Sequence, residues 1–341
     1  MQDKQPQQAG ANAVGHKSVI GAVITGITDL FRKANRIPEL DPNVRIDGKV
    51  CMVTGANSGL GKAVATQLAQ RGAKKVIMAC RSESTAARDE IIRDSGNPNV
   101  EVLQVDLSDL NSVAKFCDAL KAQRIQLDIV VFNAGLMPLE SRRSAQGYEI
   151  MFAVHFLANR YLVKRLLDDG LLNMAGDDIP RLVFVSSETH QSSAPIDFAN
   201  FAAYHEYGIK GGMKIYGLSK LYLSTFVREL SRRLNADESQ PQVAVHSLCP
   251  GPIASNIARE SPGILKPIIK PIMKLFFLTP AKAAAPVIYL SCAPQMGKTT
   301  NVYMHIMRQK LASPLATDAE NGRKLWEASE QLLAGVHPPE G

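Results

Sequence analysis

Two short motifs, far apart in the chain, contain residues whose types and spacing could carry out chemistry together. Tyr216 and Lys220 lie four residues apart in the run YGLSK, and residues 54–61 form the glycine-rich run TGANSGLG. The first pair is suited to proton transfer, and the glycine run is suited to holding a dinucleotide. Their order and separation predict one domain that brings a nicotinamide ring against the tyrosine hydroxyl. This is the arrangement of an oxidoreductase for carbonyl or alcohol groups.

The tyrosine needs help from its surroundings to act near neutral pH. Residues four apart on a helix share a face, so the ammonium group of Lys220 can lie near the phenol of Tyr216 or near a cofactor ribose. Moving a tyrosine pKa from about 10 toward neutrality takes roughly 3 pKa units, or about 4 kcal/mol. A nearby cation and a positively charged oxidised nicotinamide could together supply this. Such a tyrosine would give its proton to a carbonyl, or take one from an alcohol in reverse.

The glycine run lies where a Val-rich strand is expected to turn into a helix. Glycine is needed at Gly55, Gly59 and Gly61 because the turn uses strained dihedral angles and the backbone must approach a pyrophosphate. Amide groups at the helix N-terminus would then meet the phosphate charge. A tight turn without a ligand is the alternative, but this placement between strand and helix favours a cofactor site. The run adds three more expected cofactor contacts, Asn57, Ser58 and Leu60.

The residues that follow the next strands indicate which cofactor is bound. Arg81 ends the second strand, where an NAD site would carry Asp or Glu and a 2′-phosphate needs a cation. Arg81 therefore favours NADP(H), and a solvated arginine at a strand end is the alternative. Five further residues follow the third and fourth strands and are expected to border the adenine and ribose, although they could instead serve turns: Asp106, Leu107, Asn133, Ala134 and Gly135.

The composition excludes several classes of protein. With 341 residues, 45% of them hydrophobic and 21% charged, the chain can bury one large core as an ordinary soluble protein does. Its 5 cysteines are scattered without Cys-x-x-Cys pairs, which argues against a disulfide framework and a metal site and predicts a reducing, cytoplasmic location. The net charge is +7, but no helix carries a concentrated basic face, so nucleic-acid binding is not expected.

The N-terminal part differs from the rest of the chain. Residues 1–17 are rich in Gln, Pro, Ala and Gly and are expected to be disordered. Residues 18–45 form a predicted helical extension, because apolar residues from Val19 to Phe31 recur at helical spacing. This stretch is too short to span a bilayer and lacks the small-residue cleavage pattern of a signal peptide. The helix either packs on the domain or lies on a membrane surface.

From Lys49 onward, apolar runs of strand length alternate with helical periods. Helix-length segments between strands require right-handed crossovers, which predicts an α/β doubly wound parallel sheet, a Rossmann fold, with its ligand at the carboxyl ends of the strands. The expected strands are residues 50–54, 76–80, 100–105, 127–132, 182–186, 243–248 and a last one near 300–304.

With these motifs in place, residues 45–305 resemble the short-chain dehydrogenase/reductase family. The finer features, such as Ala79-Cys80-Arg81, Asp106-Leu107-Ser108 and Ser186-Ser187 followed by His190, are similar to the branch of retinol dehydrogenases and protochlorophyllide reductases. The resemblance implies a domain over residues 46–312 followed by a C-terminal helix and tail over 313–341. It also allows a homo-oligomer, since dimers and tetramers are common in the family, and with Arg81 the expected cofactor is NADP(H).

The resemblance also implies roles for individual residues. Ser187 would hydrogen-bond the substrate oxygen, Tyr216 would act as acid and base, and Lys220 would bind the ribose and lower the tyrosine pKa. The loop that follows the sixth strand would contact the cofactor through Pro250, Gly251 and Ile253.

One residue departs from the family pattern. The family carries a catalytic asparagine in a helix, where it helps hold a water that connects the lysine to solvent; His155 occupies this position here, and Asn159 lies one turn further on. A neutral imidazole both donates and accepts, so His155 could replace the asparagine in this relay. The substitution could equally signal impaired turnover.

The segment between Pro250 and Pro280 indicates the substrate class. It is rich in Ile, Leu and Phe with lysines at four-residue intervals, and in this fold it usually forms a lid over the substrate. An apolar lid predicts a lipophilic substrate such as a retinoid, steroid or fatty aldehyde, and its lysines would face either anionic headgroups or water. The main hypothesis is therefore an NADPH-dependent oxidoreductase for such a substrate, possible also at a membrane surface. A dinucleotide-binding scaffold or sensor with weakened catalysis is the alternative.

Overall fold

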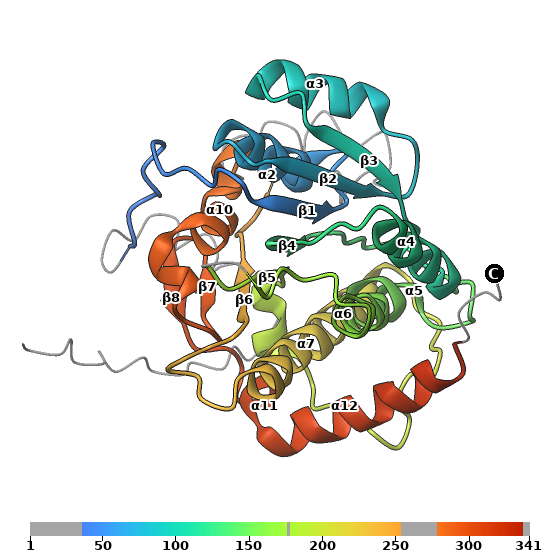
Figure 1. The fold of residues 1–341 in the computed structure, drawn as a ribbon. Helices are drawn as coiled ribbons and strands as arrows, with labels where there is room; N and C mark the ends of the chain where they lie inside the picture. Colours follow the sequence, from blue (N-terminus) through green and yellow to red (C-terminus); the bar gives the residue numbers. More distant parts are fainter. Residues whose placement is uncertain (1–35, 176–177, 254–277, 337–341) are drawn as a thin grey trace, which may run out of the picture.

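The computed structural model describes residues 36–175, 178–253 and 278–336, and these form one twisted sheet with helices on both faces (Figure 1). The eight strands lie in the order β3-β2-β1-β4-β5-β6-β7-β8. All neighbours pair in parallel except β7 and β8. The predicted doubly wound parallel sheet is confirmed. The strands are β1 Val50–Thr54, β2 Lys75–Cys80, β3 Val100–Gln104, β4 Ile129–Phe132, β5 Arg181–Val185, β6 Ala244–Cys249, β7 Tyr303–His305 and β8 Arg308–Lys310.

The helices divide between the two faces because the strand side chains alternate in direction. One core lies between the sheet and α2, α3 and α10, and the other between the sheet and α4, α6, α7 and α12. The helices are α2 Gly59–Gln70, α3 Thr85–Ser95, α4 Leu110–Ala122, α5 Ile150–Phe152, α6 Ala158–Asp168, α7 Ile209–Leu234, α9 Pro280–Ala283, α10 Ala285–Cys292, α11 Pro314–Thr317 and α12 Ala319–Ala334. Three tighter or wider turns complete them: the π-helical η1 Ala153–Leu157 and the 3₁₀ turns η2 Glu188–Ser192 and η5 Pro294–Gly297.

The C-terminal helix is part of the domain and not an appendage to it. Leu325 and Leu333 of α12 belong to the core that α7 shares with the sheet. The guanidinium group of Arg160, from α6, lies 3.8 Å from the centre of the Trp326 ring, and that of Arg233, from α7, lies 4.4 Å from the same ring. Two cations stacked on one indole fasten α12 to both helices beneath it.

Where the chain enters the domain, the described residues are not helical. The Ile37 amide donates to the Met307 carbonyl at 2.8 Å, and the buried Arg71 side chain donates to the Asp41 and Val44 carbonyls at 2.8 and 2.9 Å. The predicted helical extension is thus wrong for residues 36–45, because Arg71 takes backbone carbonyls that a helix would use internally. Residues 1–35 lie outside the described part. Among the described residues, no helix is long and apolar enough to cross a membrane.

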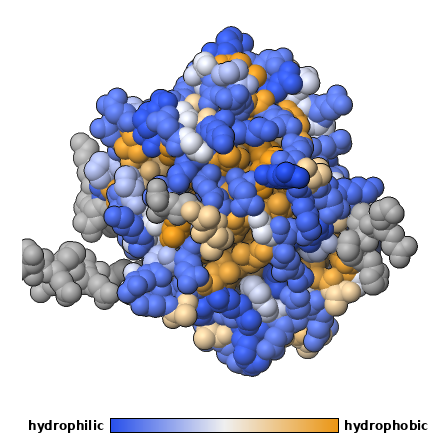
Figure 2. All heavy atoms as spheres, in the orientation of Figure 1, coloured by the Kyte–Doolittle hydropathy of each residue, from blue (hydrophilic) through white to orange (hydrophobic). Residues whose placement is uncertain are grey.

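The surface on the side shown in Figure 1 is mostly hydrophilic. Apolar side chains come to this surface in a band across the middle of the face (Figure 2). Large apolar side chains are otherwise covered, and among the described residues only Met174 and Leu311 are strongly exposed.

Candidate active site

The turn between β1 and α2 is packed so closely that side chains are excluded from it. Gly55 and Gly59 have φ angles of 66° and 54°, in the left-handed region that favours glycine. A Cβ atom on Gly61 would lie 2.3 Å from the Gly55 carbonyl oxygen and 2.4 Å from Asn133 Nδ2. Asn133 Nδ2 also donates to the Thr54 carbonyl at 2.9 Å, so the end of β4 holds the turn in place.

The N-terminus of α2 beyond this turn is suited to an anion. Ser58 is the N-cap residue, but its side chain makes no capping hydrogen bond and the first turn carries no acidic residue. The first amide groups of the helix are therefore available to a pyrophosphate, which fits a dinucleotide at this point. Leu60 is buried beneath the turn and Asn57 is exposed beside it.

The next strands end beside this turn, as the sequence predicts. Arg81 follows β2 and is exposed, and no carboxylate pairs with it in the part of the chain that the structure describes. Its carbonyl accepts a hydrogen bond from Gln104 Nε2 at 2.9 Å. Asp106, after β3, already accepts from the Ser108 amide and hydroxyl at 2.8 and 2.6 Å, while Leu107 is buried. Asp106 therefore has one carboxylate oxygen committed to its own turn.

Ser187, Tyr216 and Lys220 converge where β5 ends against α7. The Lys220 ammonium donates to the carbonyl of Val185, two residues before Ser187, at 3.0 Å. It also lies 5.7 Å from the centre of the Tyr216 ring. Ser187 is the N-cap of η2, and its hydrogen bond with the phenol works to lower the Tyr216 pKa. The three predicted catalytic side chains are thus brought together.

Burial shifts the pKa of both groups on α7 in the direction that favours their uncharged forms. It raises the pKa of Tyr216 to about 12 and lowers the pKa of Lys220 to about 8. The chain on its own therefore does not lower the tyrosine pKa, and the lowering expected from Lys220 together with a nicotinamide stays a prediction. The desolvation of the phenolate outweighs the hydrogen bond with Ser187, which acts to lower this pKa.

His155 is fully buried in η1 and uses both ring nitrogens in hydrogen bonds. Nε2 accepts from the Leu136 amide at 3.0 Å, and Nδ1 lies 2.8 Å from Ser219 Oγ. Ser219 Oγ donates to the Tyr216 carbonyl at 2.8 Å, so the proton between His155 and Ser219 belongs to Nδ1. Burial, with the nearby charge of Lys220, holds the pKa of His155 well below its usual value. The imidazole is neutral and joins the loop after β4 to α7.

This geometry does not favour the water relay through His155 that the family pattern suggests. Neither ring nitrogen is open to a water molecule, and the His155 carbonyl accepts from Asn159 Nδ2 at 2.8 Å. A Cβ atom on Gly135 would lie 3.3 Å from His155 Nε2 and 3.9 Å from Lys220 Nζ, which places both side chains against this glycine. The π-helical turn around His155 is a feature often found at functional sites.

The loop after β6, which is predicted to contact the cofactor, begins at the carboxyl end of that strand. Gly251 has a φ angle of 86°, and a Cβ atom there would lie 2.9 Å from Ile306 Cγ1. Pro250 precedes it, and Ile253 forms a bridge with Leu278. The predicted lid over residues 254–277 lies outside the described residues.

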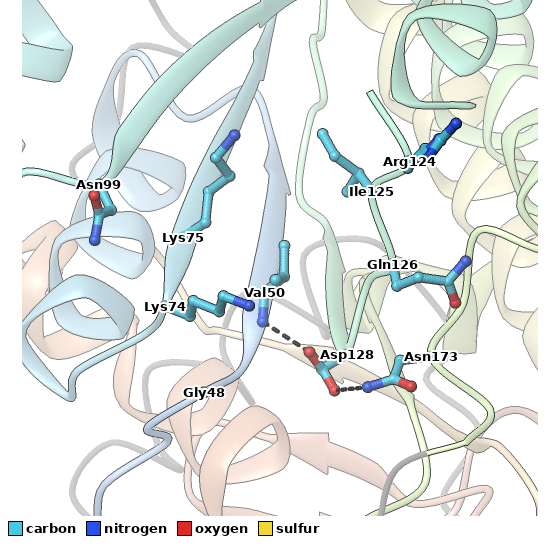
Figure 3. A pocket seen from close by; sticks show the side chains of 10 residues that line it. All are labelled: Gly48, Val50, Lys74, Lys75, Asn99, Arg124, Ile125, Gln126, Asp128 and Asn173. Atoms are coloured by element: carbon cyan, nitrogen blue, oxygen red, sulfur yellow. Dashed lines mark hydrogen bonds between the residues drawn. The ribbon is translucent and has the colours of Figure 1, made fainter. Parts of the chain in front are cut away.

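A cavity of about 550 Å³ lies at the opposite edge of the sheet (Figure 3). Its lining includes Val50 and Lys75, at the amino ends of β1 and β2, and Asp128, just before β4. The Asp128 carboxylate accepts from the Val50 amide at 2.8 Å and from Asn173 Nδ2 at 2.9 Å. Ligands of doubly wound sheets bind at the carboxyl ends of the strands, so this cavity is not the cofactor site.

Comparison with known proteins supports the same assignment of family. The short chain dehydrogenase family profile matches residues 49–205. Retinol dehydrogenase 14 of Mus musculus is 32% identical over 307 residues, which cover 86% of this chain and 88% of that protein. Retinol dehydrogenase 13 of the same organism is 32% identical over 95% of this chain and 96% of its own length. The chain belongs to the short-chain dehydrogenase/reductase family.

Solved structures of other proteins share the fold. An uncharacterised protein from Mycobacterium paratuberculosis superposes with a TM-score of 0.66 and 27% identity, covering 87% of this chain and 98% of that one. The RhlG/NADP active-site complex of Pseudomonas aeruginosa superposes with a TM-score of 0.57 and 24% identity over 78% of this chain and 98% of that one.

Several groups that shape this family site were not predicted from the sequence. Ser219 and the Leu136 amide hold His155, and the Val185 carbonyl holds Lys220. Cys249, at the end of β6, lies close to both Tyr216 and Lys220. Backbone groups leave no signal in a sequence, but Ser219 stands beside Lys220 and Cys249 beside Pro250, so their neighbours could have indicated them.

The burial of Lys220 predicts that it destabilises the fold without cofactor. The free energy of unfolding of a Lys220→Met variant should exceed that of the wild type by about 2–3 kcal/mol at pH 7, because a drop in pKa from 10.5 to about 8 corresponds to roughly 3 kcal/mol. The charged lysine is disfavoured in the folded state, so the difference should be full below about pH 8 and shrink as pH rises toward 10.5.

Denaturant unfolding of the cofactor-free protein across this pH range measures the effect. Lys74→Met, at an exposed position, is the control and should show no such pH dependence. A Lys220→Met variant less stable than the wild type at pH 7 would contradict the account.

His155 is neutral and both of its ring nitrogens are hydrogen-bonded, so we expect that it does not titrate in the pH profile of turnover. Between about pH 5.5 and 7.5, turnover by the wild type and by His155→Asn should depend on pH in the same way, since the His155 pKa is held far below this range. His155→Ala should lose about 2 kcal/mol of stability, because it leaves the part-buried Leu136 amide without an acceptor. A titration near pH 6.5 in the turnover of the wild type that is missing in His155→Asn would instead support the water relay through His155.

Proposed function

We propose that this chain is an NADP(H)-dependent oxidoreductase that interconverts a lipophilic carbonyl compound and its alcohol. The observation that carries the proposal is the convergence of Ser187, Tyr216 and Lys220 at the carboxyl end of β5. The turn between β1 and α2, which leaves no room for a side chain at Gly61, follows a strand of the same sheet. Proton donor, hydrogen-bond donor and cation then face one place, where a substrate oxygen can meet the nicotinamide.

Each side chain has a distinct part in the proposed reaction. A bound NADPH would supply the hydride. Tyr216 is protonated at neutral pH, with its pKa raised to about 12, and donates that proton to the oxygen of the carbonyl being reduced. Ser187 hydrogen-bonds the same oxygen and stabilises the negative charge that develops on it. Lys220, held by the Val185 carbonyl, stands where it can bind the ribose.

His155 takes a positioning role in this proposal. Its Nε2 fixes the Leu136 amide next to Gly135, on the cofactor side, and its Nδ1 proton reaches Ser219 on the catalytic helix. Ser219 then holds the carbonyl of Tyr216. In place of the asparagine of the family, His155 thus links the Leu136 backbone to Tyr216 through Ser219.

The substrate class rests on the relatives. Proteins 32% identical over most of this chain are named retinol dehydrogenases, whose substrate is a long apolar alcohol. This supports a lipophilic alcohol or aldehyde here. The alternative of a scaffold or sensor draws on the substitution at His155. Turnover of a panel of long-chain aldehydes, retinal and steroid ketones with NADPH separates the two, because only an enzyme consumes NADPH.

Tyr216→Phe should abolish turnover, by more than a hundredfold, and leave the Kd for NADPH within a few-fold of the wild type. The hydroxyl carries the proton, while the phenylalanine ring preserves the packing. Steady-state kinetics and cofactor titration measure the two effects. Tyr222→Phe, which alters a buried tyrosine of the same helix, is the matched control and should remain active. More than a tenth of wild-type turnover in Tyr216→Phe would disprove the acid/base assignment.

Arg81→Ala should remove most of a preference for NADPH over NADH. A charge-assisted contact of about 1.5–3 kcal/mol with the 2′-phosphate corresponds to roughly ten- to hundredfold in affinity. Titration of both cofactors tests this, with Arg93→Ala, an exposed arginine of α3 paired with Asp94, as the control. Equal affinities of the wild type for the two cofactors would refute the proposed preference.

A further inference from the structure

The turn η2 carries Ser187 at its start and is fastened to the C-terminal part of the chain by a buried histidine. His190 Nδ1 lies 2.6 Å from the Ser187 carbonyl oxygen, and its Nε2 accepts from the Ser313 amide at 3.1 Å. An amide can only donate, so Nε2 is the acceptor and the Nδ1 proton goes to Ser187. The imidazole is neutral, since burial lowers its pKa, and it connects the backbone of Ser187 to that of Ser313.

A buried carboxylate fastens the same turn to the β7–β8 hairpin. Glu188, the residue after Ser187, accepts from the Tyr303 hydroxyl at 2.9 Å and from the Lys310 ammonium at 3.3 Å. Lys310 Nζ also lies 3.0 Å from His305 Nδ1. The Glu188 and His305 side chains, with Cys249, have the spacing of metal ligands, within 4.8 Å of one another. The lysine ammonium already stands between two of them as the cation, so the cluster serves as an attachment of the turn.

We propose that His190 is a positioning residue for Ser187, and that the β7–β8 hairpin with residues 311–313 thereby takes part in placing the Ser187 hydroxyl. The proposal rests on the function proposed above, in which this hydroxyl bonds the substrate oxygen. Ser187 is held in extended conformation, with φ −153° and ψ 148°, and its carbonyl takes both the His190 amide and the His190 ring. Loss of the ring contact frees this peptide to rotate, and the hydroxyl moves with it.

The chain contains a matched control for a merely structural histidine. His246, in β6, is equally buried; its Nε2 lies 2.9 Å from the Met296 carbonyl oxygen and its Nδ1 accepts from the Val302 amide at 3.4 Å. Like His190, it is a neutral imidazole between two backbone groups, and its pKa is lowered to about 4 by burial. Neither of its backbone partners belongs to the candidate active site.

A double-mutant cycle tests the proposal. The variants are His190→Phe, Ser187→Ala and the two combined, with His246→Phe as the control, and the readouts are kcat, KM, the Kd for NADPH and Tm. His190→Phe should lower kcat by about ten- to a hundredfold, the size of effect of a misplaced catalytic group, and leave NADPH binding unchanged. In the Ser187→Ala background the same change should lower kcat less than about twofold, because there is no hydroxyl left to misplace. His246→Phe should lower Tm with kcat close to that of the wild type.

The possible results distinguish the positioning role of His190 from the role of Ser187 itself. Fully additive effects of His190→Phe and Ser187→Ala on kcat would overturn the positioning role while leaving Ser187 catalytic. Wild-type kcat in Ser187→Ala would overturn the role of Ser187 itself, and this proposal with it. If His190→Phe does not fold, His190→Ala, which also removes both hydrogen bonds of the ring, takes its place in the cycle; additivity with that variant would likewise overturn the proposal.

Discussion

The burial of a lysine ammonium with no carboxylate beside it among the described residues is the constraint on which the candidate active site depends. Lys220 is 3% exposed, and in the described part of the chain only the Val185 carbonyl accepts from it. Its pKa falls to about 8, and the same burial raises that of Tyr216 to about 12. Burial in this way disfavours both the charged lysine and the tyrosinate, so in the proposed function the charges of a bound cofactor would be coupled to the state of the tyrosine.

Buried neutral histidines join separate segments of the domain without adding charge to it. His155, His190 and His246 are each fully buried, and each joins a backbone amide to a second acceptor on another segment. A neutral imidazole has one donor and one acceptor on opposite sides of a rigid ring, so it can bridge two segments that are too far apart for a direct hydrogen bond. Two of the three bridges end on the backbone or neighbours of Ser187 and Tyr216, and the third serves the far end of β6.

Much of the fold could be predicted because it follows from short-range patterns of residues in the sequence. Gly61 had to be glycine, since a Cβ atom there would collide with Gly55 and Asn133, and the seven parallel strands follow from apolar runs between helical periods. The short strand β8 was missed, because Arg308, Gln309 and Lys310 show no apolar alternation and pair only through the hairpin turn.

The unpredicted features all depend on contacts between distant segments. A sequence places His155 on the correct helix, but cannot show that Leu136 and Ser219 occupy both of its nitrogens. It likewise pairs Tyr216 with Lys220, but it cannot show how strongly burial raises the pKa of Tyr216 in the chain alone. Whether a polar side chain is bonded or available is decided by its three-dimensional surroundings.

The most direct test of the central claim is the pKa of Tyr216 with and without oxidised cofactor. The ultraviolet absorbance of tyrosinate, taken as the difference between the wild type and Tyr216→Phe, isolates this one residue during a pH titration. The account predicts ionisation near pH 12 in the free protein and at a clearly lower pH in the NADP⁺ complex, because the nicotinamide supplies the positive charge that the chain lacks. The same pKa in both states, or a pKa near neutrality in the free protein, would contradict it.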